Sequence, residues 1–264
     1  MNHEFAYSLE DFTRVRSLIA AYAGISLHEG KQNMVYNRLV RRVRSTGAGS
    51  FRAYLDTVEV PGSGERERFV NALTTNLTAF FREPHHFDTL AARAGKAARL
   101  RVWSAACSTG EEAYSAAIAL RAAGCPGAEI HATDIDTDAL ATARRGIYPL
   151  EPLERMGMDR VRPYFLRGTG ENQNLAMVRP EVRDMVKFSF HNLLGSEWPE
   201  NERFDALFCR NAMIYFDRPA QQRLLERFAT VLKPGGLLFL GHSESCAAGH
   251  AKFRNCGKTS YERK

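Results

Sequence analysis

From residue 100 onward the chain alternates strand-like apolar runs with helix-forming runs, and this order constrains the fold more than any other feature. A strand-like run at 100–103 is followed by a polar turn, an alanine-rich helical stretch at 111–123 and a second strand-like run at 129–133 that ends in acids. Strand, helix and strand in this order predict a βαβ unit with parallel strands. Further strands of the same sheet are predicted at 188–190, 206–209, 237–241 and 258–262, with a helix at 220–232.

Before this region, residues 8–74 have helical spacing and no strand alternation. We therefore expect an all-helical N-terminal domain at 1–74 and an α/β domain at 75–264 whose first segment, 75–99, is a linker. The stretch at about 166–187 is too long for a simple connection and alternates weakly, so it is predicted to form a small antiparallel insertion.

Basic side chains gather on the helical domain. Between residues 31 and 55 there are six Lys and Arg residues and no acid. At about 100° per residue, the expected second helix places apolar side chains on one side and basic ones on the other. A solvated surface explains such a face in most helices, but the missing acids favour a binding surface. The basic face consists of Lys31, Arg38, Arg41 and Arg42.

Composition narrows the possible locations. No apolar run approaches the roughly 20 residues needed to cross a bilayer, and the N-terminus lacks the pattern of a signal peptide. The five cysteines form no C-x-x-C pair and no zinc-like spacing, so reduced thiols are expected. A cytoplasmic protein that is not inserted in a membrane is predicted.

Polar residues follow the predicted strands where Rossmann-like folds bind ligands. The turn at 104–110 opens a helix, and its N–H groups suit an anionic ligand group, but its single glycine does not match the G-x-G-x-x-G pattern of nicotinamide sites. Asp134 ends the second strand, where an acid accepts hydrogen bonds from ribose hydroxyls. Asp136 is expected to cap the next helix. His85 and His86 are expected to cap, pack or face solvent, and no metal site is predicted.

Four motifs in the sequence resemble one known family. They are TNLTAFFRE at 75–83, SAACSTGEE at 104–112, HATDID at 131–136 and CRNAMIYF at 209–216. Together they resemble the CheR family of chemotaxis receptor methyltransferases, over nearly the whole chain from Thr75 to His242. The resemblance implies a Rossmann-like class I methyltransferase domain with a small antiparallel β-subdomain, a small all-α domain before it, and S-adenosylmethionine as cofactor.

The resemblance also implies roles for individual residues. Arg82 and Tyr215 match family residues near the transferred methyl group, so they are candidates for orienting the acceptor. The residues expected to bind the cofactor are Asn76, Thr78, Arg82, Glu112, Asp134, Asn192, Leu193, Arg210 and Asn211. The basic face, Lys31, Arg38, Arg41 and Arg42, is expected to bind an acidic partner.

The methyl acceptors of the family are glutamates on the helical bundles of bacterial chemoreceptors. A glutamate, with an unperturbed pKa of about 4.3, is already a carboxylate at neutral pH and needs no general base. This agrees with a sequence that has no convincing catalytic triad. The expected partner is the cytoplasmic domain of a chemoreceptor, and the expected product of the cofactor is S-adenosylhomocysteine. The enzyme is expected to be a monomer that does not bind nucleic acid.

Two alternative functions stay open at this point. The net charge of +6 also fits a nucleic acid methyltransferase, although the Asn211–Ile214 segment has no proline of the Asn-Pro-Pro-Tyr type. The second alternative is a noncatalytic adaptor that binds S-adenosylmethionine as a signal. The presence of Arg82 and Tyr215, the candidates for orienting a methyl acceptor, argues against it. Met177 stands where some peptide-binding members carry a basic residue, which disfavours binding of a receptor C-terminal peptide.

Overall fold

The computed structural model describes residues 4–95, 99–157, 162–246 and 250–264. The first three residues, on which the expectation about a signal peptide partly rests, and residues 96–98 of the predicted linker segment lie outside the described residues. Among the described helices, none is long and apolar enough to cross a bilayer.

The N-terminal domain is all-helical, as predicted. Ser8 caps the first helix in a capping box with Asp11, and Gly24 ends it in the left-handed conformation, with φ of 68°. The helices bury their apolar sides in one shared core. They are α1 (Leu9–Ala23), the 3-10 turn η1 (Glu29–Lys31), α2 (Gln32–Thr46), α3 (Phe51–Glu59) and α4 (Glu65–Leu73).

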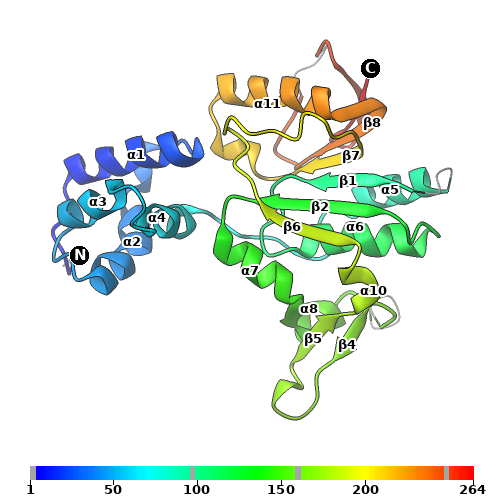
Figure 1. Cartoon of the computed structure of the whole chain (residues 1–264), viewed down its shortest axis with the longest axis horizontal. Coiled ribbons are helices and arrows are strands. Elements are labelled where there is room, and N and C mark those ends of the chain that lie inside the picture. Colours follow the sequence, from blue (N-terminus) through cyan, green and yellow to red (C-terminus); the bar gives the residue numbers. More distant parts are fainter. Residues whose placement is uncertain (1–3, 96–98, 158–161, 247–249) are drawn as a thin grey trace.

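The second domain is built on a seven-stranded sheet with the order β6-β2-β1-β7-β8-β10-β9. The first five strands in this order pair in parallel and the last two antiparallel. Figure 1 shows the helical domain beside the carboxyl ends of the parallel strands. The bounds are β1 (Arg101–Ser104), β2 (Glu129–Asp134), β6 (Val186–Phe190), β7 (Phe204–Cys209), β8 (Leu232–Leu240), β9 (Phe253–Gly257) and β10 (Ser260–Arg263).

Helices cover both faces of this sheet. Successive side chains of a strand point to opposite faces, so Val102 packs into the core under α5 and α6, whereas Trp103 packs into the core under α11. Both are buried, as expected for a central strand of a parallel sheet. The helices are α5 (His85–Ala94), α6 (Glu111–Ala122), α7 (Thr137–Arg145) and α11 (Arg218–Val231).

Several strands begin or end at other residues than predicted, and two differences concern whole segments. The segment at 232–236, expected to be a turn, belongs to β8, because a register shift between Phe204 and Ala206 lets the glycine-containing segment continue the strand. The strand at 253–257 was not predicted. It is an edge strand with four of its five residues exposed, so it carries no alternating apolar pattern.

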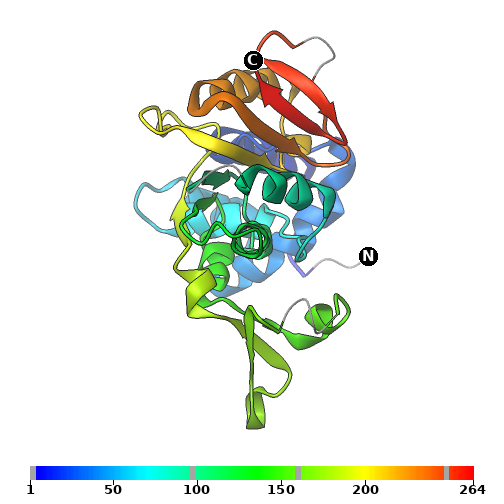
Figure 2. The same ribbon diagram turned by 90° about the vertical axis from the view of Figure 1, so that its right-hand side faces the viewer.

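A separate three-stranded antiparallel sheet forms the small subdomain. Its strands are β3 (Ile147–Pro149), β4 (Phe165–Arg167) and β5 (Leu175–Val178), in the order β3-β5-β4, and the short helices α8 (Leu150–Glu154) and α10 (Pro180–Arg183) accompany it. Figures 1 and 2 show it projecting away from the main sheet. The predicted range of 166–187 contains β5 and most of β4, but β3 comes earlier and residue 186 already starts β6.

Candidate active site

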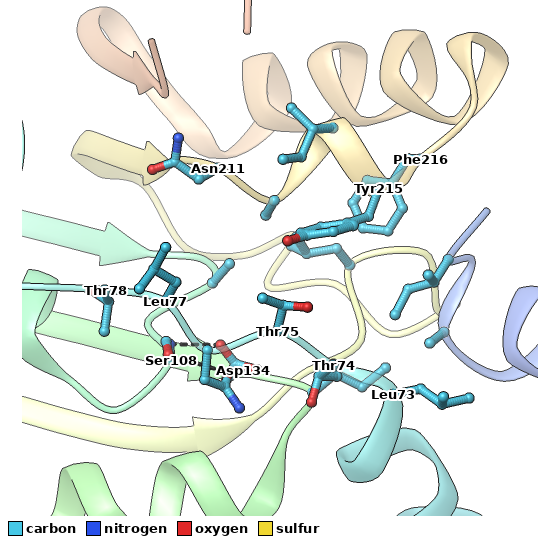
Figure 3. Close-up of a pocket in the computed structure, with 18 of the residues that line it drawn as sticks. Leu73, Thr74, Thr75, Leu77, Thr78, Ser108, Asp134, Asn211, Tyr215 and Phe216 are labelled. Carbon is cyan, nitrogen blue, oxygen red and sulfur yellow. Dashed lines mark hydrogen bonds between the residues drawn. The ribbon is translucent and has the colours of Figure 1, made fainter. Parts of the chain in front are cut away.

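A cavity of about 590 Å³ lies where the carboxyl ends of β1, β2, β6 and β7 meet the linker and the helical domain. This is the edge at which open α/β sheets bind ligands. In Figure 3 the linker residues Thr75 and Leu77 lie on one side of the cavity, and Asn211 and Tyr215 face them from the other. Every residue predicted to bind the cofactor or orient the acceptor lines the cavity: Asn76, Thr78, Arg82, Glu112, Asp134, Asn192, Leu193, Arg210, Asn211 and Tyr215.

Asp134, at the end of β2, is held by backbone groups. Its Oδ2 accepts a hydrogen bond from the Ser108 amide at 2.7 Å, and its Oδ1 accepts one from the Asp136 amide at 2.9 Å. Burial raises the pKa of Asp134, and these backbone bonds oppose the rise. The carboxylate therefore has a fixed orientation, and its remaining lone pairs can accept bonds from hydroxyl groups of a ligand.

Glu112 stands in the first turn of α6 and reaches a buried guanidinium. Its Oε1 accepts a hydrogen bond from Ser104 Oγ at 2.7 Å, and its Oε2 lies 3.4 Å from Arg210 Nη1. Burial raises the pKa of Glu112, and Arg210 lowers it. Arg210 also lies 3.5 Å from Glu83, so this one cation joins α6 to the linker.

The linker is fastened across the cavity by Asn76. Asn76 Nδ2 donates to Asp136 Oδ2 at 2.6 Å, and its Oδ1 accepts from Ser108 Oγ at 3.2 Å. Asp136 caps α7 through its other oxygen, Oδ1, which accepts from the amides of Asp138 and Ala139, so the predicted capping role is confirmed. The same carboxylate thus serves a helix end and the linker.

Arg82 is turned back onto its own segment. Its Nη1 donates to the Leu77 carbonyl at 2.9 Å, and its own carbonyl accepts from Arg210 Nη2. Its neighbours Phe81 and Glu83 have positive φ of 52° and 57°, a backbone conformation that residues other than glycine rarely adopt. The strained backbone holds the Arg82 side chain at the cavity wall.

The helical domain supplies the remaining wall. The Tyr22 carbonyl accepts a hydrogen bond from Asn192 Nδ2 at 2.9 Å. A Cβ placed on Gly24 would lie 2.0 Å from Leu194 Cδ1, so a larger residue would displace this side chain, and the positive φ of 68° also favours glycine. Tyr215, half-buried, packs against the core of the helical domain. The cavity is therefore closed only when both domains are in contact.

Buried acids outnumber buried guanidinium groups around the cavity. Glu112 and Asp134 line it, and Asp136 and Glu244 lie behind it; among the described residues, Arg210 is the one buried guanidinium. Such surroundings favour a ligand with positive charge and hydroxyl groups. S-adenosylmethionine, with an α-ammonium, a sulfonium and a ribose, fits these residues.

Comparison with known proteins decides the family. The model of the CheR all-alpha domain matches residues 10–74, and the model of the CheR methyltransferase SAM binding domain matches residues 76–262. The chain belongs to the CheR methyltransferase family. It is 50% identical to chemotaxis protein methyltransferase 2 of Pseudomonas aeruginosa, over 98% of this chain and 95% of the relative. It is 48% identical to the chemotaxis protein methyltransferase of Escherichia coli, over 99% and 93%.

Glu244 is a site residue of this CheR-family protein that the sequence did not reveal. It is buried, and its Oε2 accepts hydrogen bonds from the amides of Gly241 and Asn211 at 2.7 and 2.8 Å, while its Oε1 accepts one from Ile214 at 3.2 Å. Asn211 has a positive φ of 57°. Glu244 therefore fixes the turn that carries Asn211 and Tyr215. An acid that accepts hydrogen bonds from backbone amides leaves no motif in the sequence.

Two members of the predicted basic face have internal partners, which corrects the interpretation that the whole face offers free charge. Arg42 pairs with both oxygens of the buried Glu65, at 2.9 and 2.8 Å. Arg38 donates to the carbonyls of Leu73 and Thr74 at 2.7 and 2.6 Å. The acid missing from the sequence window comes from α4. The other two members of the face, Lys31 and Arg41, are exposed.

The adjacent histidines come close to Glu83. Among the described residues, Glu83, His85 and His86 place three metal-ligating atoms within 4.8 Å of one another. His86 is fully buried, and its Nε2 lies 3.0 Å from the Lys258 carbonyl, a contact that requires the proton on Nε2. Arg210, next to Glu83, already supplies the positive charge at this position. His86 thus packs and donates a hydrogen bond.

Proposed function

We propose that this CheR-family protein transfers a methyl group from S-adenosylmethionine to glutamate side chains on the cytoplasmic helices of a chemoreceptor. The observation that supports this most is the acid-rich cavity at the carboxyl edge of the sheet, with Arg82 and Tyr215 in its wall. The chemotaxis methyltransferases to which the chain is similar over nearly its full length support the same substrate class.

Within this proposal, Glu112 and Asp134 hold the cofactor. Glu112 lies at the start of α6 and would attract the α-ammonium, whereas Asp134 would accept hydrogen bonds from the ribose. Bound S-adenosylmethionine supplies an electrophilic methyl group on a sulfonium. Asn76, tied to Asp136 and Ser108, keeps the linker over it.

The acceptor carboxylate is oriented by Arg82 and Tyr215. Among the described residues, the Arg82 guanidinium makes one hydrogen bond, to the Leu77 carbonyl, so most of its N–H groups are available. A tight ion pair would stabilise the carboxylate as much in the ground state as in the transition state, and would not raise turnover. We infer that Arg82 and the Tyr215 hydroxyl position the acceptor without neutralising it.

The charges of the two reactants favour transfer in surroundings with little water. A carboxylate and a sulfonium lose their charges as the methyl group is transferred, so water that solvates the reactants slows the step. The contacts of Asn192 and Gly24 across the two domains close the cavity from one side. The acceptor helix itself would close the open side.

Methyl transfer to a purified receptor domain tests the proposal. Radiolabelled methyl groups should pass from S-adenosylmethionine to the receptor and leave as methanol in mild alkali, since carboxyl methyl esters are base-labile. Asp134→Asn, which lacks the acid for the ribose, is the matched control and should label weakly. Wild-type protein that binds the cofactor but labels no receptor, or that labels nucleic acid instead, would contradict the proposal.

A further inference from the structure

Two large apolar side chains project into solvent at the mouth of the cavity. Leu77, on the linker, is 78% exposed, and Ile214, on the turn after β7, is 49% exposed. Both line the cavity although they come from segments far apart in the sequence. Figure 3 shows Leu77 across the opening from Asn211 and Tyr215. Exposed apolar groups that gather at a site mark a surface that a partner covers.

The backbone at both positions is fixed. The Leu77 carbonyl accepts a hydrogen bond from Arg82, and the preceding Asn76 is tied to Asp136. The Ile214 amide donates to the buried carboxylate of Glu244. The two side chains are therefore exposed on a backbone that hydrogen bonds hold in place. This favours a preformed contact surface over a loosely packed loop.

The charge on the same rim indicates which kind of partner covers them. Lys31 and His28, from the helical domain, also line the cavity and are exposed. Among the described residues, the Lys31 ammonium makes no ion pair, so an acidic partner would meet an uncompensated cation. In the proposed function, the buried acids Glu112 and Asp134 bind the polar groups of the cofactor. The exposed apolar side chains of Leu77 and Ile214 are then available to contact the acceptor.

We propose that Leu77 and Ile214 form an apolar clamp that packs against the acceptor helix on either side of the glutamate being methylated, while Lys31 meets its acidic flank. This inference rests on the proposed function. The clamp would select glutamates that lie beside apolar side chains on a helix. It would also keep water away from the acceptor carboxylate. A free carboxylate in solution would not engage it.

Leu77→Ala, Ile214→Ala and the double variant test the clamp. Leu9→Ala is the matched control, because Leu9 is a leucine that is 70% exposed and does not line the cavity. Calorimetry gives the Kd for S-adenosylmethionine, and transfer assays give kcat and the KM for the receptor domain. We expect the double variant to raise the receptor KM about tenfold with an unchanged cofactor Kd, which corresponds to about 1.4 kcal/mol shared between the two apolar contacts. Leu77→Met should restore most of the loss at that position.

Three outcomes would overturn parts of this scheme in different ways. A double variant that labels the receptor with the wild-type KM would remove the clamp and leave the proposed function intact. A cofactor Kd that rises in step with the receptor KM would show that the two side chains cover the cofactor instead. Wild-type protein that binds S-adenosylmethionine and labels no receptor would contradict the proposed function itself.

Discussion

The backbone carbonyl of Tyr215 accepts a hydrogen bond from the amide of Ser26 at 2.8 Å. The helical domain therefore directly holds the turn that carries Tyr215. Ser26 follows α1, and Tyr215 belongs to the turn after β7. The residue proposed to orient the acceptor is therefore fixed from two sides: by the helical domain through its carbonyl, and by Glu244 through the amide of the preceding residue, Ile214.

Tyr215→Phe should slow methyl transfer without weakening cofactor binding. The ring and its packing against the helical domain are kept, and only the hydroxyl that would orient the acceptor is lost. We expect kcat to fall about tenfold, in the range of a lost positioning hydrogen bond. Tyr22→Phe, which removes a hydroxyl on α1, is the control. Unchanged turnover would remove the Tyr215 hydroxyl from the mechanism.

Glu244→Gln should weaken both the site and the fold. An amide at this position offers one oxygen and turns its NH₂ group toward backbone donors, so at least one buried N–H group loses its acceptor, at a cost of about 1–3 kcal/mol. We expect a lower midpoint in urea and weaker cofactor binding, because the Asn211 turn loosens. The exposed Glu181→Gln serves as control. A variant with wild-type stability and cofactor Kd would contradict the role given to Glu244.

The neighbours Arg41 and Arg42 should behave differently. Arg42→Ala leaves the carboxylate of Glu65, with 4% of its side chain exposed, without its bidentate partner. Because the Arg42 side chain is itself 28% exposed, solvent screens part of the loss, and we expect about 2 kcal/mol of destabilisation in denaturant unfolding. Arg41→Ala should leave stability unchanged. Equal effects of the two substitutions would argue against an internal role for Arg42.

Stability should decline as the pH falls from about 6.5 towards 4, partly through His86. Burial, and secondarily Arg210, lower the pKa of His86 from its ordinary 6.5 to about 4. In that window the unfolded chain binds a proton that the folded chain does not, so unfolding is favoured by at most about 1.4 kcal/mol per pH unit. His86→Gln keeps an N–H donor and should reduce the slope of stability against pH. His85→Gln should leave it unchanged, and an equal slope in all three proteins would contradict the prediction.

The sequence predicted the parts of the site that belong to local motifs. The strand ends at Asp134 and Arg210 and the linker from Asn76 to Arg82 could be placed because each depends on its own neighbours in the chain and on the edge shared by parallel strands. The fold class followed from the same periodicity, and the family comparison agrees with it.

What could not be predicted depends on contacts between distant segments. Glu65 neutralises Arg42 from the next helix but one, and Glu244 reaches the Asn211 amide across 33 positions of the chain. Neither acid lies in a sequence motif, and the role of each follows from its burial in the folded protein. The edge strand β9 buries only its first residue, and its other four residues are exposed, so the strand gives no periodic signal.

The close contact between Gly24 and Leu194 has a consequence for how such proteins can be recombined. A methyl group at residue 24 would overlap the end of the Leu194 side chain, so these two positions are coupled across the domain boundary although the domains match two separate family models. A chimera that takes its first 74 residues from a relative with a larger residue at position 24 would keep a closed site only by moving the side chain at position 194.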